Sequence, residues 1–371
     1  MRSAWLRADT MLVRLLVVIA GIACVLAVVA CGSDDDGVGD NSTEVASSDA
    51  SHGDSENGGD YPIELDTKWG TSTLDSKPKK IVALSVADYQ LLTALGVSPV
   101  MSVDVSKNAN VSAPDILNAK GEEDIFSGSP FSDNAGIEDI ASQNPDLIVS
   151  TAPATESIYA KLTEIAPVFS LSEGQNSKSD WRDKFTRLAE AVGESDRASS
   201  FIEDIDSKFE YSRNEISAKG NTVSVLFYYG PGTGMILNTP GTNTADLLDN
   251  MGFSSPDFAG MTSENESGVA GKISDEVIPR LESDYLIVVG SDQSIDELHR
   301  QNVFEMIPAV KQGKTLEIDS PRNAEGPVMT TINGKTFDGS ISKALVFNGP
   351  LDTKYILENL TGPLSDMTAS R

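Results

Sequence analysis

The chain has 371 residues, 28 of them basic and 56 acidic, so its formal net charge at pH 7 is −28. This length leaves room for about two domains with real cores, and the acidic balance argues against nucleic acid as a partner, because nucleic acid demands a basic surface. Two cysteines and two histidines leave little material for thiol or multi-histidine metal chemistry.

Residues 1–31 have the pattern of an export signal. Arg2, Arg7 and Arg14 give a basic start before the apolar run Leu15–Ala30, which is short for a stable transmembrane helix and suits the core of a signal peptide. The run ends in Val-Val-Ala-Cys31-Gly-Ser, which resembles the lipobox of bacterial lipoproteins and implies a lipid on Cys31. A single-pass anchor with an incidental cysteine is the alternative, and Met1 and Met11 are both possible starts.

Residues 32–60 are rich in Asp, Ser, Gly and Asn, with no aromatic residue. Such a composition cannot bury enough apolar surface to fold, so we expect a disordered acidic tether. One lipid-bearing cysteine would hold the chain to a membrane while the fold stays in water. The expected location is therefore extracytoplasmic, anchored to the cell membrane.

Residues 61–176 predict a first lobe of alternating strands and helices, which indicates parallel βα units. A hairpin is expected over Tyr61–Leu74. The predicted strands are Lys80–Leu84, Val100–Val103, Leu147–Val149 and Val168–Leu171, and the predicted helices are Asp88–Leu95, one beginning near Gly136, and Glu156–Ile165.

Residues 177–219 have a helical period interrupted at Gly193, which predicts a linker of two helices or one bent helix. Residues 220–371 predict a second lobe. Its expected strands are Thr222–Tyr229, Met235–Leu237, one ending at Val289, and Thr315–Ile318, and its expected helices are Ala245–Met251, Ile295–Phe304 and Thr353–Asn359. We interpret residues 319–339 as a long polar loop.

One helix–turn–strand pattern occurs twice. GIEDIASQNPDLIVS at 136–150 and ISDEVIPRLESDYLIVV at 273–289 each predict a helix opened by a glutamate, Glu138 or Glu276, followed by an aspartate and an apolar strand. QLLTALGV in the first lobe likewise corresponds to DLLDNMGF in the second. The repetition predicts two lobes of similar build.

The segments KIVALSVADYQLLTALGVSPVMSV, GIEDIASQNPDLIVST and LTEIAPVFSL, in this order, resemble the first lobe of class III periplasmic binding proteins. The final NGPLDTKYILENLTG resembles the last helix of that family, and the resemblance covers residues 61–365. It implies an α/β fold of two Rossmann-like lobes with mostly parallel sheets, joined by a long linker helix. It also implies a lipoprotein of an ABC importer for ferric siderophores, haem or cobalamin.

The function that this resemblance implies is capture of a ferric siderophore between the lobes and its delivery to the permease by a monomer. Iron would enter only within the bound complex, without a cofactor or a direct metal site. Haem or corrinoid binding, and an envelope receptor or scaffold without transport, remain alternatives. An enzyme is not expected, because His299 is the one histidine of the predicted lobes, and Gly230–Gly234 lacks the dinucleotide-loop spacing.

In the family each lobe presents a glutamate to the permease, and the matching residues here are Glu138 and Glu276. A glutamate that only complements the helix dipole is the alternative for each.

A ligand between the lobes should lie at the carboxyl ends of the strands. The candidates that follow strands or begin the linker are Ser85, Asp88, Lys107, Thr151, Trp181, Arg182, Tyr228, Tyr229, Met235 and Arg322. The few basic residues among them favour a neutral or cationic hydroxamate complex over a highly charged catecholate. Core packing is the alternative for each aromatic residue.

Overall fold

The computed structural model describes residues 61–103, 124–126, 135–151, 155–170, 181–230, 235–238, 240–256, 271–273, 276–291, 294–320 and 328–369. The predicted signal, the tether and Cys31 lie outside these ranges, as do Lys107 and Arg322. Within the described ranges no helix is long and apolar enough to cross a membrane.

Parallel strands form the centre of the first lobe. A three-stranded sheet has the order β3 (Ile81–Ala83), β6 (Leu147–Ser150) and β7 (Val168–Ser170), and a two-stranded sheet pairs β4 (Ser102–Val103) with β5 (Asp124–Phe126). A parallel bridge between Val82 of β3 and Met101, the residue before β4, connects the two sheets. Every residue of β3, β6 and β7 is buried, as expected for parallel strands covered on both faces.

The first lobe also holds the predicted hairpin, β1 (Ile63–Thr67) and β2 (Gly70–Leu74), and the helices α1 (Val86–Ala94), α3 (Ala135–Ser142) and α4 (Glu156–Thr163). Helix α1 begins where the Ser85 side chain accepts a hydrogen bond from the Asp88 amide. It ends before Gly96, whose φ of +72° favours glycine.

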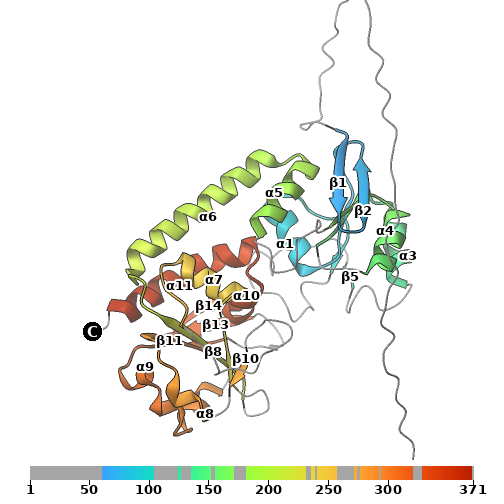
Figure 1. Ribbon diagram of the computed structural model, residues 1–371. Helices are drawn as coiled ribbons and strands as arrows, with labels where there is room; N and C mark the ends of the chain where they lie inside the picture. Colours follow the sequence, from blue (N-terminus) through green and yellow to red (C-terminus); the bar gives the residue numbers. More distant parts are fainter. Residues whose placement is uncertain are drawn as a thin grey trace, which may run out of the picture. The chain divides into compact units, whose positions relative to one another are not determined.

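Two helices join the lobes, as one of the two linker predictions requires. Helix α5 (Trp181–Val192) ends at Gly193, which has a φ of +66°, and α6 (Ser195–Ile216) follows it. A left-handed residue cannot continue a helix, so the break lies where the glycine stands. Helix α6 packs along α11 (Pro350–Ala369), the last helix of the chain (Figure 1).

The second lobe contains a seven-stranded sheet. In spatial order its strands are β10 (Gly271–Ile273), β9 (Met235–Leu237), β8 (Val223–Tyr228), β11 (Tyr285–Gly290), β12 (Thr315–Asp319), β13 (Met329–Ile332) and β14 (Lys335–Asp338). The three central strands, β8, β11 and β12, are parallel, and the edge strands pair antiparallel. The predicted α/β fold with two lobes and a linker is confirmed, with antiparallel edges that were not foreseen.

The prediction of a polar loop over residues 319–339 is wrong in its second half. Strands β13 and β14 form a hairpin there, closed by Asn333 and Gly334 with φ values of 49° and 77°. Positive φ at both central residues is what a two-residue hairpin turn requires, and Asn-Gly is the preferred sequence for it.

The prediction that Glu276 opens a helix is also wrong. Glu276 lies in a turn, and only a short 3-10 helix, η1 (Ile278–Arg280), follows. Pro279 has no backbone N–H, so it cannot donate the i→i−4 hydrogen bond that an α-helix running through Glu276 would need.

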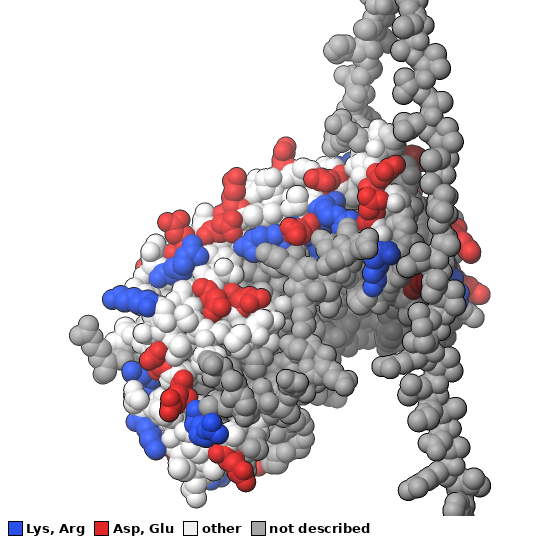
Figure 2. Space-filling view, viewed as in Figure 1, with Lys and Arg blue, Asp and Glu red and all other residues white. Residues whose placement is uncertain are grey.

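The remaining helices of the second lobe are α7 (Asn243–Asn250), α8 (Ser294–His299), η2 (Phe304–Met306), α9 (Pro308–Lys311) and α10 (Ile341–Phe347). Helix α11 also packs against α1 of the first lobe, where the buried Gln90 donates to Asp352 at 2.8 Å. On the face shown in Figure 2, acidic side chains are interspersed with basic ones, a mixed surface of the kind that favours solubility.

Candidate functional site

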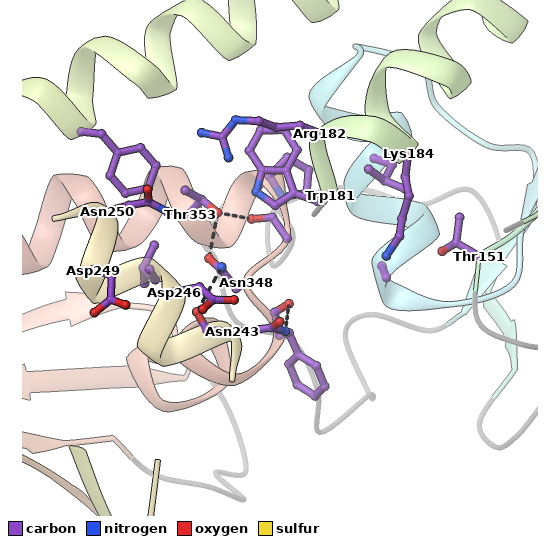
Figure 3. A pocket seen from close by; sticks show the side chains of 17 residues that line it. Thr151, Trp181, Arg182, Lys184, Asn243, Asp246, Asp249, Asn250, Asn348 and Thr353 are labelled. Carbon is purple, nitrogen blue, oxygen red and sulfur yellow. Dashed lines mark hydrogen bonds between the residues drawn. The ribbon is translucent and has the colours of Figure 1, made fainter. Parts of the chain in front are cut away.

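A cavity of about 460 Å³ is lined by both lobes and by the linker (Figure 3). The first lobe contributes Ala87, Leu91 and Thr151, and the linker contributes Trp181, Arg182, Lys184 and Phe209. The second lobe contributes Asn243, Asp246, Leu247, Asp249, Asn250, Phe347, Asn348, Gly349, Pro350 and Thr353. A cavity with apolar and polar groups at the junction of two lobes has the features of a small-molecule site.

The linker wall is an aromatic surface that carries a cation. The Trp181 ring packs edge-on against Phe185 and Phe201, with centroids 5.6 and 6.1 Å away. The Arg182 guanidinium lies 4.9 Å from the Trp181 ring and forms an ion pair with Asp206 at 2.9 Å. The aromatic packing and the ion pair together fix the orientation of both cavity-lining side chains.

Beneath the first-lobe wall lies a buried carboxylate. Asp88 accepts hydrogen bonds from the Thr151 amide at 2.8 Å, from the Thr151 hydroxyl, and from the Ser85 hydroxyl at 2.7 Å. Burial raises the pKa of Asp88, while these hydrogen bonds and the charge of Lys184 act in the opposite direction. Asp88 thus ties the start of α1 to the end of β6 and orients Thr151, which lines the cavity.

Helix α7 provides the polar wall. Asn243, Asp246 and Asn250 recur at the helical spacing that places them on one face, and Asp249 lies beside them (Figure 3). Burial raises the pKa of Asp249, and the negative charge of Asp246 adds to this, whereas hydrogen bonding with Ser255 opposes it. Because Asp246 and Asp249 both carry carboxyl groups, the wall opposite Lys184 and Arg182 is acidic.

Of the ten predicted ligand contacts, some line the cavity, some lie behind its wall, and others lie elsewhere or outside the described residues. Thr151, Trp181 and Arg182 line the cavity, and Ser85 and Asp88 support it from behind. Lys107 and Arg322 lie outside the described residues.

The three second-lobe aromatic and sulfur candidates do not line the cavity. Tyr228 is 1 % exposed and Met235 3 % exposed, and both belong to a core cluster of the second lobe. Tyr228 accepts a hydrogen bond from Gln301 at 2.9 Å, and the Tyr229 hydroxyl contacts that of Ser342. Core packing, the alternative given for the aromatic candidates, describes Tyr228, and Met235 belongs to the same core cluster.

Sequence reasoning missed the α7 wall and the turn between α10 and α11. The polar residues of α7 share one helix face, a signal that was available, but a polar face usually indicates solvent. Only the placement of α7 opposite α5 turns that face into the wall of a cavity (Figure 3).

Glu138 and Glu276, the predicted docking residues, are both exposed, and Glu138 lies in the first turn of α3. Among the described residues, no group of three or more His, Cys, Asp or Glu side chains has the arrangement of a metal site.

Comparison with known proteins gives concordant matches. The family model for periplasmic binding proteins matches residues 81–321. The chain is 24 % identical over 270 residues to the ferric enterobactin-binding periplasmic protein FepB of Escherichia coli, covering 68 % of this chain and 82 % of FepB. It is 28 % identical over 266 residues to the "Probable siderophore-binding lipoprotein YfiY" of Bacillus subtilis, covering 67 % of this chain and 78 % of YfiY.

A solved structure has the same fold. The crystal structure of PiaA from Streptococcus pneumoniae in complex with ferrichrome superposes with a TM-score of 0.61 at 21 % identity, covering 83 % of this chain and 99 % of PiaA. Because the family model spans well over half of the residues, the chain belongs to the periplasmic binding protein family.

Proposed function

We propose that this protein is a lipid-anchored substrate-binding protein of an ABC importer that captures a ferric siderophore between its lobes. The observation that carries the proposal is the cavity lined by Thr151 of the first lobe, Trp181 of the linker and Asn243 of the second lobe. Similarity to FepB, YfiY and PiaA, whose names and titles describe enterobactin, siderophore and ferrichrome binding, supports iron complexes as the ligand class.

The charges of the lining support a neutral or cationic complex, such as a ferric hydroxamate. The cation of Arg182 is already paired with Asp206, and the charge of Lys184 acts on the buried Asp88, where burial raises the carboxyl pKa and Lys184 opposes part of that rise. Asp246 and Asp249 would repel a highly anionic catecholate complex.

Tryptophan fluorescence titration tests the proposal directly. Trp181 lines the cavity, so a bound ferric complex should quench its emission, and a Trp181→Phe variant should lose most of that signal. The panel is ferrichrome and other ferric hydroxamates, ferric enterobactin, haem and cobalamin. Saturable binding of a ferric siderophore is expected, whereas binding of haem or cobalamin alone would favour the corrinoid or haem alternative. Binding of none would favour an envelope receptor or scaffold.

The charge preference has its own test. Asp246→Asn combined with Asp249→Asn should raise the affinity for ferric enterobactin by about tenfold and leave that for ferrichrome unchanged. Asp196→Asn with Glu203→Gln, both exposed on α6, is the matched control, because it removes the same charge away from the cavity. Equal gains in both double variants would contradict the preference.

We also propose that Glu138 and Glu276 dock the protein on the permease. Both carboxylates are exposed, and they occupy matching positions of the two repeated segments. Glu138→Ala with Glu276→Ala should abolish iron import in cells and leave ligand affinity intact. Glu156→Ala, an exposed glutamate in the first turn of α4, is the control and should import normally. A loss of affinity in the double variant would contradict docking.

Anchoring through Cys31 completes the proposal. Cys31→Ser should release the protein from the membrane fraction without changing its ligand affinity, and retention in the membrane fraction would support the single-pass anchor instead.

A further inference from the structure

We propose that Phe347 determines ligand specificity by packing against an apolar flank of the bound ferric complex. This inference rests on the proposed function and adds the second-lobe contact that receives the ligand. The structure supplies three observations for it, which concern the exposure of the ring, the turn that carries it, and the chemistry of the facing wall.

Phe347, a large apolar side chain, leaves nearly half of its surface exposed to solvent. It is 45 % exposed, and its neighbour Val346 is 41 % exposed. Two other large apolar side chains in the described part of the chain are comparably exposed, Tyr211 and Met306. Of these four, Phe347 alone lines the cavity between the lobes. Isolated exposed apolar residues are common, so exposure becomes informative here because it coincides with that cavity.

The last turn of α10, which carries Phe347, is fixed by two side chains of α7. The Asn243 side-chain amide donates to the carbonyls of Val346 and Phe347, at 3.1 and 3.4 Å, and Thr244 donates to the carbonyl of Leu345 at 2.8 Å. Asn348 follows in the left-handed conformation with a φ of 46° and ends α10. A side chain on so restrained a backbone meets a ligand at little cost in conformational entropy.

The first lobe packs closely against the residues that follow Phe347. A Cβ atom on Gly349 would lie 2.3 Å from Oε1 of Gln90, a residue of α1. Asp352 of α11 accepts hydrogen bonds from the Gln90 side chain at 2.8 Å and from the Gly349 amide at 3.4 Å, and Thr353 of α11 donates to Asn348 at 2.9 Å. Hydrogen bonds to α7 and α11 therefore hold this turn, a preorganised placement for a binding residue.

The chemistry of the facing wall indicates the ligand class. Trp181 and Phe209 of the linker line the same cavity as Phe347, so aromatic surface is available from two elements. The polar side chains Asn243, Asp246 and Asn250 of α7 line the cavity as well. A ferric complex with apolar flanks, formed by methylene arms or methyl groups, matches this combination of aromatic and polar lining, and a compact complex covered by charged carboxylates does not.

Titration of paired variants tests the inference. Phe347→Ala should weaken binding of the preferred ferric siderophore by about tenfold or more, as expected for loss of a buried aromatic contact. Phe347→Leu should retain most of the affinity. Val346→Ala is the matched control, since Val346 is exposed on the same turn and does not line the cavity, and it should bind as the parent does. Unchanged thermal unfolding in each variant excludes a folding defect as the cause.

Each outcome decides the matter. If the parent binds ferric complexes and Phe347→Ala binds them equally well, the specificity role is wrong and the proposed function stands. If Val346→Ala loses as much affinity as Phe347→Ala, disturbance of the turn explains the effect and the inference is also wrong. If the parent binds no ferric complex, the proposed function fails and this inference with it.

Discussion

Helix α6 meets the two lobes through equivalent arginine residues. Arg197 donates to the carbonyl of Ala94 at 3.3 Å, near the end of α1, and Arg213 donates to the carbonyl of Asn250 at 2.9 Å, at the end of α7. Each carbonyl belongs to the residue two positions before the glycine that follows the helix, Gly96 or Gly252. An arginine at the carboxyl end of a helix satisfies free carbonyls and complements the helix dipole.

The strands at the ends of the two repeated segments, β6 and β11, also begin alike. Asp146 accepts hydrogen bonds from the amides of Lys79 and Lys80 at 2.8 and 2.9 Å, and Asp284 accepts them from the amide and hydroxyl of Thr222 at 2.8 and 2.9 Å. Each aspartate thereby fixes the start of its own strand to that of the neighbouring parallel strand.

The lobes differ where they face the cavity. Helix α1 presents the apolar residues Ala87 and Leu91, whereas α7 presents Asn243, Asp246 and Asn250. The equivalent helices of the two lobes therefore differ in the side chains that they present to the cavity, since those named from α1 are apolar and those named from α7 are polar. The comparison shows that contacts with the linker and the sheet are shared by the lobes, and that the lining of the cavity is not.

The largest expected effect comes from the buried carboxylate of the first lobe. Asp88→Ala should lower the free energy of unfolding by about 3 kcal/mol, because it leaves the buried Thr151 amide without its acceptor. Urea unfolding measures the loss. Ser294→Ala is the counterpart in the second lobe, where a neutral hydroxyl donates to the Tyr228 carbonyl at 3.0 Å, and should cost about 1 kcal/mol. Equal losses of unfolding free energy in Asp88→Ala and Ser294→Ala would contradict the expected difference between the lobes.

The aspartates at the strand starts should behave identically. Asp146→Ala and Asp284→Ala should each lower the free energy of unfolding by about 1 kcal/mol, since each removes the acceptor of two hydrogen bonds at an exposed site. The double variant should show the sum, because the two sites lie in separate sheets. A loss confined to one lobe would show that the repeated segments are not equivalent.

A double-mutant cycle distinguishes the two arginine contacts. A Cβ atom on Gly96 would lie 2.5 Å from Cζ of Arg197, whereas the nearest atom to one on Gly252 is Cγ of Arg213 at 3.5 Å. Gly96→Ala and Arg197→Ala should therefore couple by about 0.5–1 kcal/mol. Gly252→Ala and Arg213→Ala should be additive in the same unfolding measurement, and strong coupling in the second lobe would contradict the geometry.

The smallest effect is a pH dependence specific to the second lobe. Burial lowers the pKa of His299, but hydrogen bonds with Glu305 and Glu317, together with their charges, raise it above its ordinary value. The contribution of His299 to the free energy of unfolding is fully present below pH ~6.5, the pKa of histidine in the unfolded chain. It is lost as the pH rises through the higher pKa of the folded state. Because the ring is partly exposed, the contribution should stay below about 0.5 kcal/mol.

Unfolding between pH 6 and pH 9 measures this contribution. The parent should lose it over that range, and His299→Gln should not. An identical pH slope in the variant would exclude His299 as its origin.

Much of the scaffold was predictable because its signals are local. Buried apolar runs identified β3, β6, β8 and β11, and Gly193 marked the break in the linker. The Asn333-Gly334 hairpin had an equally local signal, which the polarity of its surroundings obscured. The cavity wall was not predictable in this way, because the positions of Asn243 and Phe347 depend on how α7 and α10 pack within the folded molecule.

The contact between Gln90 and Gly349 has a consequence for sequence evolution. Gly349 leaves no room for a side chain while glutamine occupies position 90, since its Cβ would overlap Oε1 of Gln90. These two positions, far apart in the sequence and in different lobes, are therefore constrained as a pair. A homologue with a larger residue at position 349 should carry a shorter one at position 90, so the two positions should covary within the family.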